Sequence, residues 1–126
     1  MEFTLEATFT TTPSELYNAW LNGELHEQMT GGGATCSNEI GGEFSAWGGY
    51  IWGKNLALTP NKKIVQTWRT TEFADDEKDS KIEVTLETVP EGTKLTLVHT
   101  NLPAHGEQYI NGWKEHYFVP MTAFFN

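Results

Sequence analysis

Four histidines are the side chains that could most readily bind a metal ion or move a proton: His26, His99, His105 and His116. The last two are eleven residues apart, so on a helix they would share one face but lie about 16 Å apart along the axis. One ion cannot bind both across that distance. We therefore expect no metal site and no other cofactor.

His99 lies in an alternating segment, on the same face as Leu95 and Leu97. We expect its ring to point toward the interior of the protein. Two interpretations stay open. The ring is either a buried group that hydrogen-bonds a neighbouring side chain, or a polar contact to a ligand in a cavity.

The sequence does not place the partners needed for nucleophilic or acid–base catalysis near one another. The single cysteine, Cys36, has no base beside it, and it cannot form an internal disulfide. Glu83 and Glu87 fall on the polar face of a strand and Glu115 on the polar side of a helix, which favours surface charge. Arg69 is either a surface ion-pair partner or an inward-facing polar anchor.

Two segments have the composition of ligand-binding loops but lack the required spacing. The glycines between residues 31 and 49 precede neither a helix N-terminus nor a Lys-Ser/Thr pair, so they predict turns rather than a phosphate loop. The acidic residues between 72 and 79 lack the mid-loop glycine and closing glutamate of a calcium loop. We expect a solvated hairpin loop there.

Aromatic residues make up 13% of the chain and include five tryptophans. Trp52 shares strand parity with Leu56 and Leu58, Trp68 lies on a neighbouring strand, and Trp113 lies on a helix seam. We expect these three tryptophans to meet between sheet and helix. Large rings in that position either fill a core or line a cavity for a small amphipathic molecule, and both alternatives remain open.

Alternation of apolar and polar residues predicts the elements that would position these side chains. Strands are expected around residues 3–9, 44–46, 52–58, 64–70, 82–87 and 95–99. Between the first two, Thr12 followed by Pro13 and Glu15 has the pattern of a capping box, which predicts a short helix. Gly23 is expected to end that helix before a second helical turn.

The last twenty residues have a helical period instead. Tyr109, Trp113, Tyr117, Pro120 and Phe124 fall within about 80° of one another on a helical wheel, which predicts a long amphipathic helix. Pro120 lacks an amide hydrogen and should bend the helix near its end.

Length and charge limit the classes of function. A chain of 126 residues fits a single domain, residues 1–126. Seventeen acidic and eight basic residues give a net charge of −9, which repels nucleic acid and anionic membranes. No stretch approaches the roughly 18 apolar residues of a membrane span, and residues 1–12 lack the apolar run of a signal peptide. We expect a cytoplasmic protein, monomeric or weakly homodimeric.

The order of these elements has few compact solutions. An antiparallel sheet must curve around the C-terminal helix, with two short helices after the first strand, which is an α+β fold of the helix-grip type. Such curvature usually leaves a cleft between helix and sheet.

Several motifs carry a resemblance that covers nearly the whole chain. They are Pro13 to Trp20, Gly41-Gly42-Glu43-Phe44, Gly49 to Gly53, Leu58-Thr59-Pro60, Ile64 to Arg69, and Gly112-Trp113 with Tyr117. With them the sequence resembles the C-terminal domain of the activator of heat-shock protein 90 ATPase, within the START-like (SRPBCC) superfamily.

The resemblance implies the helix-grip fold and, for the superfamily, hydrophobic ligands held in the cleft. It also implies that the eukaryotic members stimulate the chaperone's ATPase with the help of an additional N-terminal domain. We expect that domain to be missing here, because the sequence starts at the first predicted strand. For stand-alone members the resemblance implies a binding role. It does not identify any residue of this sequence as catalytic.

Three hypotheses follow. The first is a module that binds a small hydrophobic or amphipathic molecule. The second is a protein-interaction module for a chaperone of the heat-shock protein 90 class, and the third is a cyclase-like or hydrolytic enzyme in which His99 or Tyr109 moves a proton. The residues expected to line the cleft are Phe44, Trp52, Trp68, Leu97, His99, Tyr109, Trp113 and Tyr117.

Overall fold

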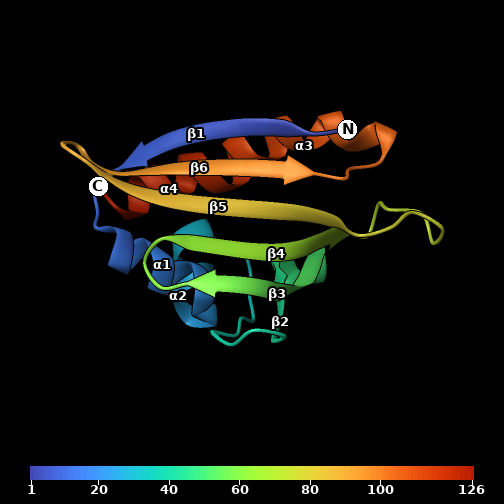
Figure 1. The fold of residues 1–126 in the computed structure, drawn as a ribbon, viewed down its shortest axis with the longest axis horizontal. Helices are drawn as coiled ribbons and strands as arrows, with labels where there is room; N and C mark the ends of the chain where they lie inside the picture. Colours follow the sequence, from blue (N-terminus) through green and yellow to red (C-terminus); the bar gives the residue numbers. More distant parts are fainter.

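Six strands form one antiparallel sheet in the computed structural model, which describes residues 1–126. They are β1 (Phe3–Phe9), β2 (Glu43–Ala46), β3 (Ile51–Thr59), β4 (Lys63–Thr70), β5 (Ser80–Val89) and β6 (Gly92–Thr100), arranged in the order β1-β6-β5-β4-β3-β2. Figure 1 shows the sheet in front, with the helices covering its far face. The predicted α+β helix-grip architecture is confirmed.

The side chains of β4 and β6 alternate strictly between buried and half-buried positions along each strand. In β4 the inward series includes Trp68, and in β6 it includes Leu97 and His99. Every second residue of a strand lies on the same face of the sheet. Each of these two strands therefore packs one row of side chains against the helices. The inward orientation predicted for His99 is correct.

Helices α1 (Pro13–Leu21) and α2 (Gly23–Thr30) follow the first strand. The hydroxyl of Thr12 accepts a hydrogen bond from the backbone N–H of Glu15 at 3.1 Å, as the capping pattern predicts. The side chain of Asn22 caps α2 in the same way, accepting from the N–H of Leu25 at 3.0 Å. Gly23 therefore begins the second helix rather than ending the first.

The C-terminal helix is continuous from residue 104 to residue 124. It consists of η2 (Ala104–Glu107), α3 (Gln108–Trp113), η3 (Lys114–Phe118) and α4 (Val119–Phe124), of which η3 is a π-helical turn. The N–H of Val119 donates to the carbonyl of Lys114, five residues earlier. No helix of the chain combines the length and the apolar character that crossing a bilayer requires.

The wide turn changes which residues face the sheet. Tyr109, Trp113 and Tyr117 are buried, as the helical wheel predicts, but Phe124 is 39% exposed and Met121 is fully buried instead. The prediction for Phe124 is wrong because a π-turn takes more than 3.6 residues and rotates the following residues around the axis.

Strand β3 contains an irregularity that the sequence pattern did not reveal. Its pairing with β4 shifts between Asn55 and Ala57. Trp52 and Leu56, which lie before and within this bulge, are 39% and 45% exposed, whereas Leu58 beyond it is partly buried. Because an extra residue reverses the alternation, parity with Leu58 is misleading. Trp52 does not meet the other tryptophans between sheet and helix, so that prediction is wrong.

The acidic segment forms the loop between β4 and β5, which extends beyond the end of the sheet in Figure 1. Arg69 holds this loop. Its guanidinium donates to the carbonyl oxygens of Ala74 (2.7 Å) and Glu77, and it forms an ion pair with Asp79 at 3.3 Å. Of the two alternatives for Arg69, the surface ion pair is correct.

Candidate ligand-binding cavity

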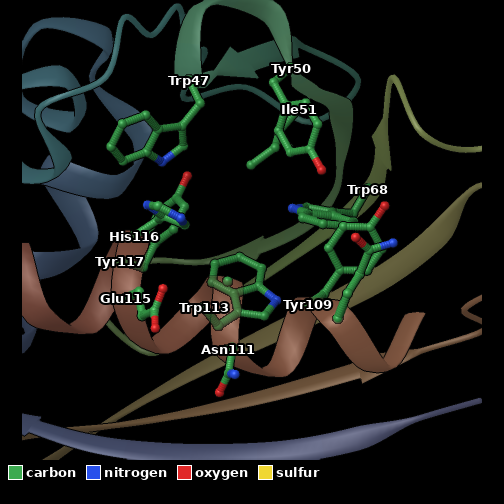
Figure 2. A pocket seen from close by; sticks show the side chains of 12 residues that line it. Trp47, Tyr50, Ile51, Trp68, Tyr109, Asn111, Trp113, Glu115, His116 and Tyr117 are labelled. Atoms are coloured by element: carbon green, nitrogen blue, oxygen red, sulfur yellow. The ribbon is translucent and has the colours of Figure 1, made fainter. Parts of the chain in front are cut away.

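A cavity of about 380 Å³ lies between the sheet and the C-terminal helix. Figure 2 shows its walls, which come from the η1 turn (Trp47–Gly49), the start of β3, the end of β4 and the C-terminal helix. The lining residues are Trp47, Tyr50, Ile51, Trp68, Gln108, Tyr109, Asn111, Gly112, Trp113, Glu115, His116 and Tyr117. The aromatic rings therefore line a space rather than filling it completely.

Four of the eight residues expected at the cleft line this cavity: Trp68, Tyr109, Trp113 and Tyr117. The other four do not. Phe44, Leu97 and His99 are buried in the core away from it, and Trp52 lies on the outer face of the sheet. Alternation identifies which side chains point inward, but it does not distinguish those that end against other side chains from those that reach a cavity.

The rings of the cavity floor are fixed by contact with one another. The centroids of Trp68 and Trp113 are 5.7 Å apart, and Trp20 of α1 stacks on Trp113 at 6.1 Å with 17° between the ring planes. Tyr109 meets Trp68 edge to face at 4.9 Å, and Tyr117 lies 4.7 Å from Trp113. Such offset and edge contacts stabilise each ring position by roughly 0.5–1.5 kcal/mol beyond burial. This side of the cavity is preformed.

His99 is fully buried beneath this cluster and has a defined tautomer. The indole N–H of Trp113 donates to its Nδ1 at 3.0 Å, so the ring proton must be on Nε2. Nε2 lies 2.9 Å from the hydroxyl of Ser80, which in turn donates to the carbonyl oxygen of Trp68 at 2.6 Å. Burial lowers the pKa of His99 to about 3. The ring is neutral and takes no part in lining the cavity.

His26 of α2 has the opposite tautomer. Its Nδ1 lies 2.8 Å from the carbonyl oxygen of Trp20, which only accepts, so Nδ1 carries the proton. Nε2 therefore accepts from the hydroxyl of Tyr117, also at 2.8 Å. Burial lowers the pKa of His26 and raises that of Tyr117. The polar tip of Tyr117 is thus used inside the protein, although its ring lines the cavity.

The hydroxyl of Tyr109 is also paired within the protein. It lies 2.7 Å from the hydroxyl of Thr70 at the end of β4, and burial raises the pKa of its phenol. The hydroxyl of Tyr50 donates to the carboxylate of Glu72. The polar groups that the sequence suggested as ligand contacts therefore bond to protein partners.

Trp47 is a cavity residue that the sequence analysis did not identify. Its indole nitrogen is the one buried side-chain nitrogen or oxygen atom without a hydrogen-bond partner. The residue has a left-handed backbone with φ of 54°, and the next two, Gly48 and Gly49, have φ of 66° and 93°. A left-handed non-glycine residue stores about 1–3 kcal/mol of strain. A tryptophan directly before a glycine pair was the available signal.

Gly112 contributes space on the helix side of the cavity. A Cβ built at this position would meet no atom within 4 Å. Glycine inside a helix is less stable than alanine by about 1 kcal/mol, and here no close packing requires it. The open space beside Gly112 belongs to the cavity.

The polar residues of the lining are Gln108, Asn111, Glu115 and His116, all on the C-terminal helix and all exposed. Lysine and arginine are absent from the lining. Together with the net charge of −9, this composition disfavours anionic ligands.

Neither His99 nor Cys36 supplies acid–base or nucleophilic chemistry to the cavity. His99 has both nitrogens engaged and a strongly lowered pKa, so it is a poor proton carrier for a cavity ligand. Burial raises the pKa of the Cys36 thiol to about 11, which keeps it protonated and unreactive. No three His, Cys, Asp or Glu side chains converge closely enough to hold a metal ion.

Comparison with known protein families places residues 10–125 under the model described as "Activator of Hsp90 ATPase homolog 1-like protein". The chain is 35% identical over 114 residues to the activator of 90 kDa heat shock protein ATPase homolog of Dictyostelium discoideum. That alignment covers 87% of this chain and 29% of the relative.

The human activator homolog 1 is 31% identical over 120 residues, covering 93% of this chain and 35% of the relative. The chain thus spans about a third of the length of these curated relatives. Among solved structures, an HSP90 activator from Plasmodium falciparum superposes with a TM-score of 0.88 at 26% identity. That superposition covers 98% of this chain and 95% of the other.

Proposed function

The chain belongs to the family of Activator of Hsp90 ATPase homolog 1-like proteins, and we propose that it is a binding domain that holds a small, largely apolar molecule in the cavity between sheet and helix. The observation that carries the proposal is the preformed aromatic lining around about 380 Å³ of space. That volume lies within the range of small-molecule sites.

Gly112 supports this assignment. Filling the space beside it with a side chain would gain helix stability, yet the position leaves that space open. An empty apolar cavity lowers stability because its walls lose contacts, and a ligand restores them. A cavity kept open in this way is consistent with an occupant.

Gly112 also provides the test. We would titrate the wild-type chain with a panel of small aromatic and aliphatic molecules and follow tryptophan fluorescence and calorimetric heat. The variant Gly112→Leu places an isobutyl group in the cavity, and the matched variant Gly112→Ala adds only a methyl. We expect Gly112→Leu to lose binding at least tenfold and Gly112→Ala to retain most of it. Equal affinities in all three proteins would contradict the proposal.

A second candidate is binding to a chaperone of the Hsp90 class. The observation that favours it is the structure of the HSP90 activator from Plasmodium falciparum, a chain of nearly the same extent. Here the exterior rather than the cavity would carry the function. Trp52 and Leu56 are exposed large apolar residues on β3.

Purified Hsp90 distinguishes the two candidates. If the exterior acts, the chain will bind Hsp90 or change its ATPase rate, Trp52→Ala with Leu56→Ser will weaken the effect, and Gly112→Leu will leave it unchanged. If the cavity is the only functional site, the ATPase rate will not respond to the chain.

A further inference from the structure

We propose that the molecule held in the cavity is uncharged and carries a hydrogen-bond acceptor, most simply a ketone, ester or amide carbonyl, and that the indole N–H of Trp47 recognises it. This inference rests on the proposed ligand-binding function and specifies the class of ligand.

The position of Trp47 is determined from several sides. The chain turns sharply through the left-handed residues 47–49, and the N–H of Gly48 donates to the carbonyl of Gly33 at 2.9 Å. The indole ring lies directly over Gly32, where a Cβ would come within 2.5 Å of it. On the helix side its edge meets the ring of His116, with centroids 5.4 Å apart. Turning the indole nitrogen toward another protein group would therefore require these contacts to be broken.

The direction of that nitrogen indicates the complementary group. Figure 2 shows the indole nitrogens of Trp47 and Trp68 on opposite walls, both directed toward the cavity. The nitrogen of Trp47 is buried, and the protein offers it no acceptor. An indole nitrogen donates and does not accept, so only an acceptor group satisfies it. Leaving such a donor unpaired costs free energy that an acceptor on a ligand would recover.

Charge decides between the possible acceptors. A carboxylate or phosphate would enter a cavity without lysine or arginine, past Glu115, in a protein with net charge −9. A buried anion without a cationic partner is strongly disfavoured. A neutral carbonyl places an acceptor at Trp47 without that penalty, while its apolar substituents contact the surrounding rings.

The experiment compares benzophenone with diphenylmethane, two molecules of similar shape that differ by a carbonyl oxygen. The variant Trp47→Phe removes the donor and keeps an aromatic ring. The matched control is Trp52→Phe, which makes the same change on the outer face of the sheet. Dissociation constants come from calorimetry, and circular dichroism establishes that each variant is folded.

We expect Trp47→Phe to weaken benzophenone binding about three- to tenfold and to leave diphenylmethane binding unchanged. Trp52→Phe should alter neither. If benzophenone binds the wild type and Trp47→Phe with equal affinity, the role proposed for Trp47 is wrong and the proposed function stands. If neither probe binds the wild type but other molecules of the panel do, this inference is wrong and the proposed function stands. If no molecule of the panel binds the wild type, both are contradicted.

A measurement on the wild-type chain does not depend on how well the variant folds. The indole proton of Trp47, assigned by triple-resonance spectroscopy, should move downfield when benzophenone binds and should not do so with diphenylmethane. A resonance that responds in the same way to both probes would overturn the inference.

Discussion

The indole N–H of Trp113 donates to Nδ1 of His99 at 3.0 Å, and this hydrogen bond joins the floor of the cavity to strand β6 of the sheet. Because the indole can only donate, it requires a neutral His99 with its proton on Nε2. A second proton on the ring would point at another N–H group. The contact therefore excludes the protonated form of the histidine while the protein is folded.

We predict that stability decreases in acid because of His99. Its pKa is about 3 in the folded protein and 6.5 ordinarily, so between these values the unfolded chain binds a proton that the folded chain does not. The stabilisation is complete above pH 6.5 and is lost as the pH falls toward 3, by about 1.4 kcal/mol per pH unit. Urea unfolding at intervals from pH 8 to pH 4 measures this slope. His26, whose pKa burial also lowers, contributes in the same direction.

The variant His99→Gln separates the two histidines. Glutamine does not titrate, so the free energy of unfolding should depend on pH less steeply in this variant, and the remaining slope belongs to His26 and the carboxylates. A wild-type slope that His99→Gln leaves unaltered would contradict the assignment.

The hydrogen bond from Tyr117 to His26 predicts a loss of stability in Tyr117→Phe. Removing the hydroxyl leaves the buried Nε2 of His26 without a donor, and we expect the free energy of unfolding to fall by about 1–3 kcal/mol. Tyr17→Phe is the matched control, because Tyr17 lies in the same core but outside this network. Chemical denaturation of both variants checks the difference. Equal, small effects would show that the bond contributes little.

Gly112→Ala should stabilise the protein. The added methyl meets no atom within 4 Å, and alanine favours the helix over glycine by about 1 kcal/mol. The melting temperature should rise by a few degrees for a domain of this size. A decrease in melting temperature would mean that the space beside Gly112 is too narrow for a methyl group.

Arg69→Lys should loosen the loop between β4 and β5 with little effect elsewhere. Lysine keeps the charge but lacks the two guanidinium nitrogens that donate to the carbonyls of Ala74 and Glu77 at the same time. We expect faster hydrogen exchange at the amides of residues 74–77 and a change in global stability below about 1 kcal/mol. Unchanged exchange at those amides would show that Arg69 does not hold the loop.

The strands and the first half of the C-terminal helix could be predicted because their apolar residues are regularly spaced. Tyr109, Trp113 and Tyr117 recur every four residues, and burial of that seam requires no information from other parts of the chain. Prediction failed where the backbone departs from its period. Because of the β3 bulge, Trp52 lies on the outer face instead of the predicted inner one. Because of the π-turn, Phe124 is exposed instead of buried.

Trp47 was missed for a different reason. Its role depends on a left-handed turn and on the ring lying over Gly32, which precedes the turn by fifteen residues. Neither local propensity nor alternation contains that contact. His99 shows the complementary limit. Its inward orientation followed from the sequence, but whether its nitrogens faced a ligand or Ser80 and Trp113 depended on tertiary packing.

An intermolecular NOE measurement on the wild-type chain with bound benzophenone locates the binding site. If the cavity is the binding site, the ligand protons will show NOEs to the rings of Trp47, Trp68 and Trp113. NOEs confined to Trp52 and Leu56 on the outer face of β3, with none to the cavity rings, would show that the molecule binds outside the cavity.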